Sequence, residues 1–455
     1  MRTMNRLSAL ALLLVLLVAG CKKKDLTPSA PPINVIAKMS YDNSGGTYAF
    51  PLTGIKVKLT NQMNNVVLEQ QTDATGLAIF NSISSGSYNI DASITISKAD
   101  YESITGLPLQ TDDVTFNASK SGQVLNTTTN NTIEMKLEFG VIGDWVIKQI
   151  YYAGSHTTNG ASFRDQFIEI YNNSNKVLYA DSMYIAQLFG SNTVSPDQST
   201  GNFINDGGLL QGQWDWSKSY GNTAGADAAT KYVYPRTIFR IPGTGTQYPV
   251  QPGEGIVLAA TAVNHKAPYT NAGGTSVNIN DPSLTVDLSA ANFEFYLRDA
   301  IPNPLDSDVD NPGVPNLVVV DRIVNRDLIL DNPGREAIII FKSKASLTTE
   351  FSRLATPNYK TAADTVGRDR YLQLPNSVII DAVQIQHATP ASRVPRRLVG
   401  SLDAGAYNVP AGQYSSQSMI RKTATTVGTR KVLRDTNNST EDFDYFDRAA
   451  PGEFK

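Results

Sequence analysis

The sequence predicts an all-β protein, with an N-terminal β-sandwich followed by a larger β-sandwich that carries long loop insertions. Three observations indicate this fold class. Short segments with alternating apolar and polar side chains recur along the chain, and this period of two is typical of half-buried strands. Asn, Thr, Ser, Gly and Tyr are abundant, which favours turns and strands. Long segments with the helical period of apolar residues are few.

The segment Phe167–Leu188 shows the strand pattern most clearly. Phe167–Tyr171 alternates, Asn172–Asn175 supplies a turn, and Lys176–Leu188 continues as a second, mostly apolar extended run. Alternation interrupted by an Asn-rich turn is the short-range signature of a β-hairpin. The sequence therefore predicts that the two runs pair with each other.

Length and composition are those of a globular protein with a core. The chain has 455 residues, and at about 150 residues per domain this predicts two or three domains. Hydrophobic residues make up 41% and charged residues 18% of the sequence. The net charge of −3 provides no basic field of the kind that attracts nucleic acid, so no nucleic-acid partner is expected.

The first residues form a separate segment with the features of a secretory signal. Arg2 and Arg6 give it a positive start, and Leu7–Val18 is an apolar run that is too short to cross a bilayer as a helix. We therefore expect residues 1–20 to be a signal peptide and residues 21–32 to be a Pro-containing tether.

The string LVAGC, which ends at Cys21, resembles the lipobox of bacterial lipoproteins. The resemblance implies that the Cys21 thiol is diacylglycerated and its new amine is acylated, with palmitate as an expected acyl chain, and such chains anchor a protein to a membrane. Asp25 lies too far along to resemble the inner-membrane retention signal, so attachment to the outer membrane, facing the periplasm or the surface, is expected. The alternative is an unmodified thiol. Because Cys21 is the only cysteine, an internal disulfide and a cysteine-based zinc site are excluded.

Residues 33–140 form the first predicted domain. Ile55–Leu59 alternates strictly and predicts a half-buried strand, and Val66–Gln70 is a second candidate. The polar segment Asn117–Thr132 predicts a loop, and Thr132–Gly140 predicts the last strand of this domain.

A motif inside this domain carries a family resemblance. From Thr72 the sequence reads T-D-x-x-G-x-x-x-F and then I-x-x-G-x-Y-x-I, with a tight turn expected at Asp73 and Gly76. This order resembles the transthyretin-like, or carboxypeptidase-regulatory-like, sandwich, which is Ig-like. That fold has no fixed activity, so the resemblance implies a fold and not a function.

Residues 141–455 form the second predicted domain. Its motifs, F-I-E-I-Y-N-N, P-G-E-G-I-V-L-A and the tail D-T-N-N-S-T-E-D-F, resemble a lamin-tail domain. A lamin-tail core is much shorter than this span, so insertions are expected at about Gly190–Pro235 and Ala300–Pro315. The pair of domains also resembles a family of uncharacterised Gram-negative lipoproteins of unknown function. The predicted strands are Trp145–Tyr152, Phe293–Leu297, Leu317–Val324, Ala337–Phe341 and Val378–Gln384.

One acidic loop is a candidate calcium site. Asp306, Asp308 and Asp310 alternate on a turning chain, and carboxylate oxygens are the hard ligands that Ca²⁺ prefers. The position at which an EF-hand places its bidentate Glu is Leu317, and Pro312 also departs from that pattern. The alternative is a solvated acidic loop.

An aromatic cluster is a candidate ligand-binding site. Trp214, Trp216 and Tyr220 lie in the first insertion, and exposed aromatic rings beside Asp and Asn are what a sugar platform needs. Alternatively, the two Trp rings project to one face and simply cover the sandwich.

The remaining charged groups give no catalytic constellation. The three histidines are widely separated, and neither a G-x-S-x-G elbow nor a phosphate-binding Gly loop is present. Arg and Lys residues make the final quarter locally basic, and a solvated face is the interpretation favoured over a nucleic-acid site. These residues are Arg393, Arg396, Arg397, Arg421, Lys422, Arg430, Lys431 and Arg434.

The sequence therefore predicts a lipid-anchored protein that is not an enzyme. It is expected to bind or scaffold, as an accessory of an outer-membrane protein or a surface glycan. The alternative is a secreted hydrolase with an acidic site in the insertions, for instance with Asp215 and Glu169 brought together by folding. A purely structural spacer is a third class.

Overall fold

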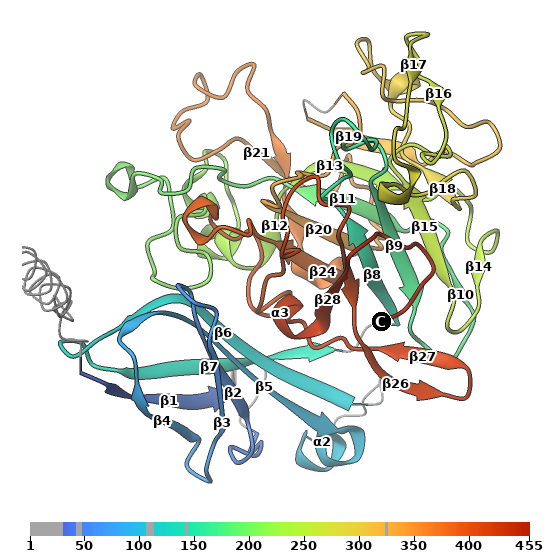
Figure 1. Cartoon of the computed structure of the whole chain (residues 1–455). Coiled ribbons are helices and arrows are strands. Elements are labelled where there is room, and N and C mark those ends of the chain that lie inside the picture. Colours follow the sequence, from blue (N-terminus) through green and yellow to red (C-terminus); the bar gives the residue numbers. More distant parts are fainter. Residues whose placement is uncertain (1–30, 42–47, 106–112, 142–143, 324–325) are drawn as a thin grey trace, which may run out of the picture.

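In the computed structural model the described residues are 31–41, 48–105, 113–141, 144–323 and 326–455. The predicted signal peptide, Cys21 and most of the predicted tether lie outside these residues. Among the described residues, no helix combines the length and the apolar character that a membrane span requires. The chain is nearly all β, and its strands form two sandwich-like parts (Figure 1).

A seven-stranded sheet makes up the N-terminal part. Its strand order is β3-β2-β5-β6-β7-β1-β4, and β1 pairs in parallel with β7 and antiparallel with β4. The short helix α2 (Lys98–Thr105) follows β5. The strands are β1 (Ile33–Tyr41), β2 (Lys56–Asn61), β3 (Val67–Gln71), β4 (Leu77–Ile83), β5 (Gly86–Ser97), β6 (Asp113–Leu125) and β7 (Thr132–Val141).

Period-two patterning explains the faces of this sheet. Val57 and Leu59 of β2 are fully buried in the first core, whereas Lys58 between them lies on the opposite face. The expected turn is also present, because the Asp73 carboxylate accepts hydrogen bonds from the backbone N–H of Thr75 and of Leu77. Gly76 has φ +81°, a left-handed value that glycine adopts without strain.

One prediction for this part was wrong. The segment Asn117–Thr132 was expected to be a loop, but β6 extends to Leu125 and pairs with β5 along that length. Its polar side chains include Ser119, which lies on the face of the sheet opposite the core. A polar strand face therefore resembled a loop in the sequence.

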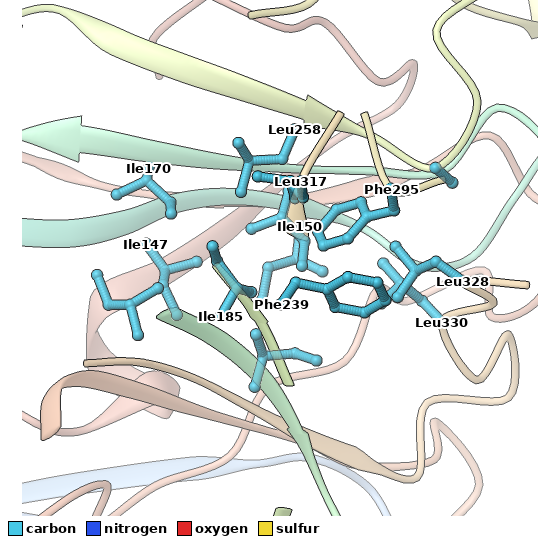
Figure 2. Close-up of a cluster of buried hydrophobic side chains, with 14 of the residues drawn as sticks. Ile147, Ile150, Ile170, Ile185, Phe239, Leu258, Phe295, Leu317, Leu328 and Leu330 are labelled. Carbon is cyan, nitrogen blue, oxygen red and sulfur yellow. The ribbon is translucent and has the colours of Figure 1, made fainter. Parts of the chain in front are cut away.

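The C-terminal part is a sandwich of a five-stranded and a six-stranded sheet. Side chains from both sheets interdigitate in one core, which includes Ile147, Ile170, Ile185 and Phe239 (Figure 2). One sheet has the order β19-β13-β11-β20-β24 and the other has the order β18-β15-β9-β8-β25-β28. The first contains β19 (Val318–Arg322), β13 (Pro235–Arg240), β11 (Tyr184–Leu188), β20 (Glu336–Phe341) and β24 (Ile379–Ile385). The second contains β18 (Phe293–Glu294), β15 (Gly255–Ala259), β9 (Phe167–Asn172), β8 (Trp145–Tyr151), β25 (Ser418–Arg421) and β28 (Phe443–Phe446).

The hairpin predicted within Phe167–Leu188 does not form. The strand β9 pairs with β8 and β15, whereas β11 belongs to the opposite sheet and pairs with β13 and β20. The turn itself exists, since the side-chain amide of Asn172 donates to the carbonyl of Lys176 at 2.8 Å. After this turn the chain crosses from one sheet to the other, so the segment connects the two layers of the sandwich.

Short elements connect the large sheets. The first predicted insertion, Gly190–Pro235, holds only 3₁₀ turns and one two-residue strand before β13. The small paired strands are β10 (Leu178–Tyr179) with β14 (Pro249–Val250), β12 (Tyr232–Val233) with β23 (Leu374–Pro375), β16 (Tyr269–Thr270) with β17 (Ser276–Val277), β21 (Arg353–Leu354) with β22 (Tyr371–Leu372), and β26 (Thr423–Val427) with β27 (Arg430–Leu433). The remaining helical turns are η1 (Gln198–Thr200), η2 (Trp216–Lys218), η3 (Gly225–Ala229), η4 (Pro282–Leu284), η5 (Arg298–Ala300), η6 (Asn376–Val378), η7 (Pro390–Ser392) and α3 (Ser439–Asp442).

Candidate functional site

A polar cleft lies between the two parts of the chain. It has a volume of about 850 Å³, and its lining comes from β2, β5 and β6 of the N-terminal sheet and from several loops and α3 of the C-terminal part. We call this space the polar cleft. Its lining includes Thr60, Asn89, Asp91, Ser119, Gln386, Arg396, Tyr407 and Thr440.

The wall on the N-terminal sheet follows from strand register. Asp91 of β5 is paired with Lys58 of β2 on one side and with Ser119 of β6 on the other, so the three side chains form one row across the sheet. The Ser119 hydroxyl donates to the Asp91 carboxylate at 2.7 Å. Asp91 is 4% exposed, and burial raises its pKa to about 6.

The opposite wall contains Arg396. Its guanidinium is buried and donates to the backbone carbonyls of Asp403 and Ala404. Its Nε has no hydrogen-bond partner among the described residues. Burial lowers the pKa of Arg396, and the nearby carboxylates of Asp403 and Asp91 partly offset that effect.

Gln386 supplies a second unused polar atom in this wall. The side chain is 5% exposed, and its Nε2 donates to the carbonyl of Val394 at 3.1 Å. The Gln386 Oε1 accepts no hydrogen bond from any described residue. A buried amide oxygen without a partner costs stability, so a ligand that donates to it would recover that interaction.

An ion pair beside the polar cleft joins the two parts. Lys58 Nζ donates to the Glu441 carboxylate of α3 at 2.9 Å, and Arg434 approaches the same carboxylate at 3.3 Å. Burial opposes the ionisation of Glu441, but the hydrogen bond and the charge of Lys58 outweigh it and lower the Glu441 pKa. The pair therefore fixes β2 against α3, next to Asp91.

A buried charge cluster holds α3 in place. The Arg421 guanidinium contacts the carboxylates of Asp381 at 2.6 Å, Asp435 at 3.1 Å and Asp442 at 3.4 Å. Asn438 caps α3 by accepting from the backbone N–H of Thr440. The tail motif D-T-N-N-S-T-E-D-F is thus part of a structural cluster that positions one wall of the polar cleft.

The expectation of a solvated basic face was wrong for two of its members. Arg421 and Arg396 are buried, at 2% and 6% exposure. The guanidinium of each donates to a backbone carbonyl and lies close to carboxylates. The Arg421 guanidinium pairs with three buried carboxylates, whereas Arg396 lies near the carboxylates of Asp403 and Asp91, and this opposite charge makes the burial possible. The pairing partner Asp381 of Arg421 comes 40 residues earlier, which no local pattern indicates.

The three carboxylates of the candidate calcium site have separate partners. Asp306 is exposed and lies 3.6 Å from Arg298, and Asp308 is buried and accepts from the backbone N–H of Leu297 at 3.1 Å. Asp310 accepts from the side-chain amide of Asn316 at 2.9 Å. Within the described parts of the chain, no three His, Cys, Asp or Glu side chains gather closely enough to hold a metal ion. The calcium site stays a prediction.

The aromatic cluster of the first insertion is mostly packed. Trp216 is 4% exposed and stacks on Tyr234 with ring centroids 3.7 Å apart, whereas Trp214 packs on Phe203 at 4.5 Å. Tyr220 is 47% exposed. Trp216 therefore follows the alternative in which the Trp rings pack against the protein, because its ring lies in a buried, largely aromatic cluster. Sugar binding by these residues stays a prediction.

The two acids of the hydrolase alternative also have separate partners. Glu169 is buried in β9 and pairs with Lys148 at 2.9 Å. Asp215 accepts from Ser217 and pairs with Lys218 at 2.9 Å. Each carboxylate is thus neutralised by a neighbour in its own region.

The residues of the polar cleft were not predicted from the sequence. Asn89, Asp91 and Ser119 occupy the polar face of strands, which is where any solvated residue would lie. Gln386 and Arg396 follow β24 in irregular segments. The one available signal was the alternation Tyr88, Ile90, Ala92, which places Asp91 on the face away from the core.

Fold and cleft together define a class: an all-β protein of two sandwich-like parts with a polar cleft between them. The sequence profile of a family described as "Protein of unknown function (DUF4876)" matches residues 251–449, which is less than half of the chain. No curated protein matches the sequence.

Eight chains of solved structures are similar to this chain, among them the following three. A DUF4876 family protein from Bacteroides thetaiotaomicron VPI-5482 is 22% identical, with 91% of this chain and 95% of that chain covered and a TM-score of 0.47. A candidate adhesin from Bacteroides ovatus ATCC 8483 is 14% identical, covering 37% of this chain and 58% of that chain, with a TM-score of 0.18. The full-length major pilin SpaD from Corynebacterium diphtheriae is 12% identical, covering 50% and 65%, with a TM-score of 0.15.

Proposed function

We propose that this protein is held at the outer membrane by acyl chains on Cys21 and binds a hydroxyl-rich ligand, the sugar of a surface glycan, in the polar cleft without catalysing a reaction. The observation that carries this proposal is the polar cleft itself, in which buried atoms of Gln386 and Arg396 have no hydrogen-bond partner within the described parts of the chain. Its volume of about 850 Å³ lies within the range of small-molecule sites.

The lining suits a sugar chemically. Side-chain amides, hydroxyls and a carboxylate offer both donors and acceptors, and adjacent sugar hydroxyls can satisfy both at once. Asn89 and Asp91 of β5 and Thr440 of α3 supply such groups, and Tyr407 adds a partly exposed ring against which a sugar face can pack.

We propose that the polar cleft does not catalyse hydrolysis because its lining contains too few acidic side chains. Among the described residues that line the polar cleft, Asp91 is the only acid. Glycoside hydrolysis ordinarily requires two carboxyl groups that flank the scissile bond. A single carboxyl that accepts from Ser119 supports ligand binding better than it supports hydrolysis.

Attachment to the outer membrane is proposed from the sequence alone. The lipobox-like string before Cys21 and the tether of residues 21–32 support an acylated N-terminus. Mass spectrometry of Cys21 in the natural protein checks this part: acyl chains are expected, and a bare thiol would contradict it.

Ligand binding is checked with the mature chain, residues 21–455. A panel of bacterial surface oligosaccharides is screened first, and the best is titrated calorimetrically against the parent protein and two variants. We expect Asp91→Asn and Gln386→Leu each to weaken binding by about tenfold, because each leaves a sugar hydroxyl without its partner.

Gln251→Leu is the matched control, because Gln251 is an exposed amide outside the polar cleft. Its affinity is expected to equal that of the parent. Equal weakening in all three variants would contradict a site in the polar cleft. If no oligosaccharide binds and one outer-membrane protein is recovered stoichiometrically from detergent extracts, the partner is a protein and not a glycan.

A further inference from the structure

One end of the N-terminal sheet combines exposed apolar side chains with the exit of the tether. The turn between β2 and β3 carries Met63, which is 87% exposed, and Val66, which is 51% exposed. Val67 and Val124 are 44% and 63% exposed. Singly exposed apolar residues are common on proteins, but several at one end of a domain indicate a contact surface.

Hydrogen bonds place these residues at the same end of the sheet. The backbone N–H of Gln62 donates to the carbonyl of Ser87 at 2.9 Å, and Ser87 is paired with Val124 of β6. The start of β1 joins them, because Ile33 is paired with Ile83 just before the turn that leads to Gly86. The tether that precedes Ile33 therefore leaves the domain at the end where Met63 is exposed.

This end also carries no charge in its connecting segments. Residues 61–66, 81–87 and 121–131 contain no Asp, Glu, Lys or Arg. The opposite end differs, because β5 runs from Gly86 to α2, whose residues include Lys98, Asp100 and Glu102. We call the uncharged end the neutral end. A surface without charges can approach lipid without the desolvation cost that acids and bases would add.

We propose that the neutral end, through Met63, Val66, Val67 and Val124, docks on the lipid bilayer to which Cys21 is attached. The proposal rests on the proposed function, which supplies the anchor. The 12 residues from Cys21 to Pro32 reach at most about 40 Å when fully extended, so the anchor holds the neutral end near the bilayer surface. The free energy falls when apolar side chains that are held there leave water for the interface.

Docking also orients the polar cleft. Gln62 and Gln123, which belong to the neutral end, contribute to the lining of the polar cleft. The mouth of the polar cleft would therefore lie beside the membrane surface, where glycans attached to lipid or to membrane proteins begin.

The test uses the lone cysteine. The mature chain is coupled through the Cys21 thiol to a maleimide lipid in vesicles of phosphatidylethanolamine and phosphatidylglycerol, which supplies an anchor whether or not cells acylate this residue. A Met63→Trp variant reports contact with the bilayer when brominated phospholipid quenches the added fluorescence. Val427→Trp is the control, because Val427 is 57% exposed but lies on β26 of the C-terminal part (Figure 1).

Docking predicts that brominated lipid quenches most of the emission added by Met63→Trp and leaves that of Val427→Trp unchanged. Adding Val66→Lys to the Met63→Trp protein should abolish the quenching, because a lysine at the turn opposes its entry into the interface. Equal quenching at both positions, or none at Met63→Trp in the coupled protein, would overturn the proposal. A bare Cys21 in the natural protein would instead contradict the proposed anchor and leave the quenching result intact.

Discussion

The charged guanidinium of Arg421 is buried away from water, and three aspartate side chains contact it. The side chains of Arg421, Asp381, Asp435 and Asp442 are each 1–2% exposed. Burial raises the pKa of Asp381 and of Asp442, whereas the charge of Arg421 opposes that rise. Removing one partner of such a cluster leaves the others buried and uncompensated, which costs more than the intact cluster contributes.

Arg421→Met is therefore expected to lower the free energy of unfolding by about 3–5 kcal/mol. Urea denaturation of residues 21–455 measures this loss. Arg448→Met is the control, because Arg448 is exposed, and its effect should stay within about 0.5 kcal/mol. Similar losses in both variants would show that the buried cluster contributes no more to the free energy of unfolding than an exposed arginine does.

Asp165 predicts a dependence of stability on pH. It is fully buried, Tyr151 donates to it at 3.2 Å, and burial raises its pKa to about 7. In an unfolded chain the pKa is about 3.9, so the folded state binds this proton more tightly. The stability that the protonated group provides is complete below about pH 4 and is lost as the pH rises toward 7.

Asp165→Asn keeps an acceptor for Tyr151 and removes the titrating group. We expect the variant to be more stable than the parent by about 2–4 kcal/mol at pH 8, with a difference that shrinks toward zero at pH 4. Denaturation midpoints measured across this pH range give the comparison. A constant difference across the range would contradict a raised pKa.

For Asp181, the contribution to stability should depend on pH in the opposite direction, which the variant Asp181→Asn tests. Burial opposes the ionisation of Asp181, but hydrogen bonds from the backbone N–H of Gln247, Gly245 and Tyr248 outweigh it and lower its pKa. Its contribution is present above pH 4 and is lost as the pH falls through the folded pKa. The variant should therefore lose stability at neutral pH, and its difference from the parent should shrink in acid.

At the scale of elements, most strands follow from local pattern, whereas their partners do not. The alternating segments Ile55–Leu59 and Trp145–Tyr152 correspond closely to β2 and β8, and Ala337–Phe341 corresponds to β20. The predicted hairpin failed because alternation specifies a strand but not its neighbour. All six residues of β9 are buried, which is the mark of a central strand with a neighbour on each side.

The contact between β2 and α3 gives an element-scale prediction. Lys58 and Glu441 are 18% and 10% exposed, so water screens their attraction only in part. A double-mutant cycle with Lys58→Met and Glu441→Gln should give a coupling free energy of about 1–2 kcal/mol.

The control cycle uses Lys56 and Glu69, which pair at 3.3 Å within the N-terminal sheet but are 42% and 48% exposed. Their coupling should be below about 0.5 kcal/mol. If the two cycles gave the same coupling, the Lys58–Glu441 contact would not be a specific joint between the two parts.

At the scale of the whole molecule, the candidate site exists only because two parts meet. Asp91 comes from β5, Arg396 from a loop after β24, and Thr440 from α3, so the lining spans most of the described chain. Pattern in the sequence could predict that Asp91 faces away from the core, since the strand alternation indicates it. It could not predict what would cover that face, because the covering residues lie some 300 positions away.

The central claim is that a hydroxyl-rich ligand occupies the polar cleft. The most direct measurement is hydrogen–deuterium exchange of residues 21–455 with and without a bound oligosaccharide. Occupation of the polar cleft predicts slower exchange in β5, β6 and residues 386–408, with no change at Trp214–Tyr220. Protection confined to Trp214–Tyr220, with β5 and β6 unaffected, would contradict the claim and move the site to the aromatic insertion.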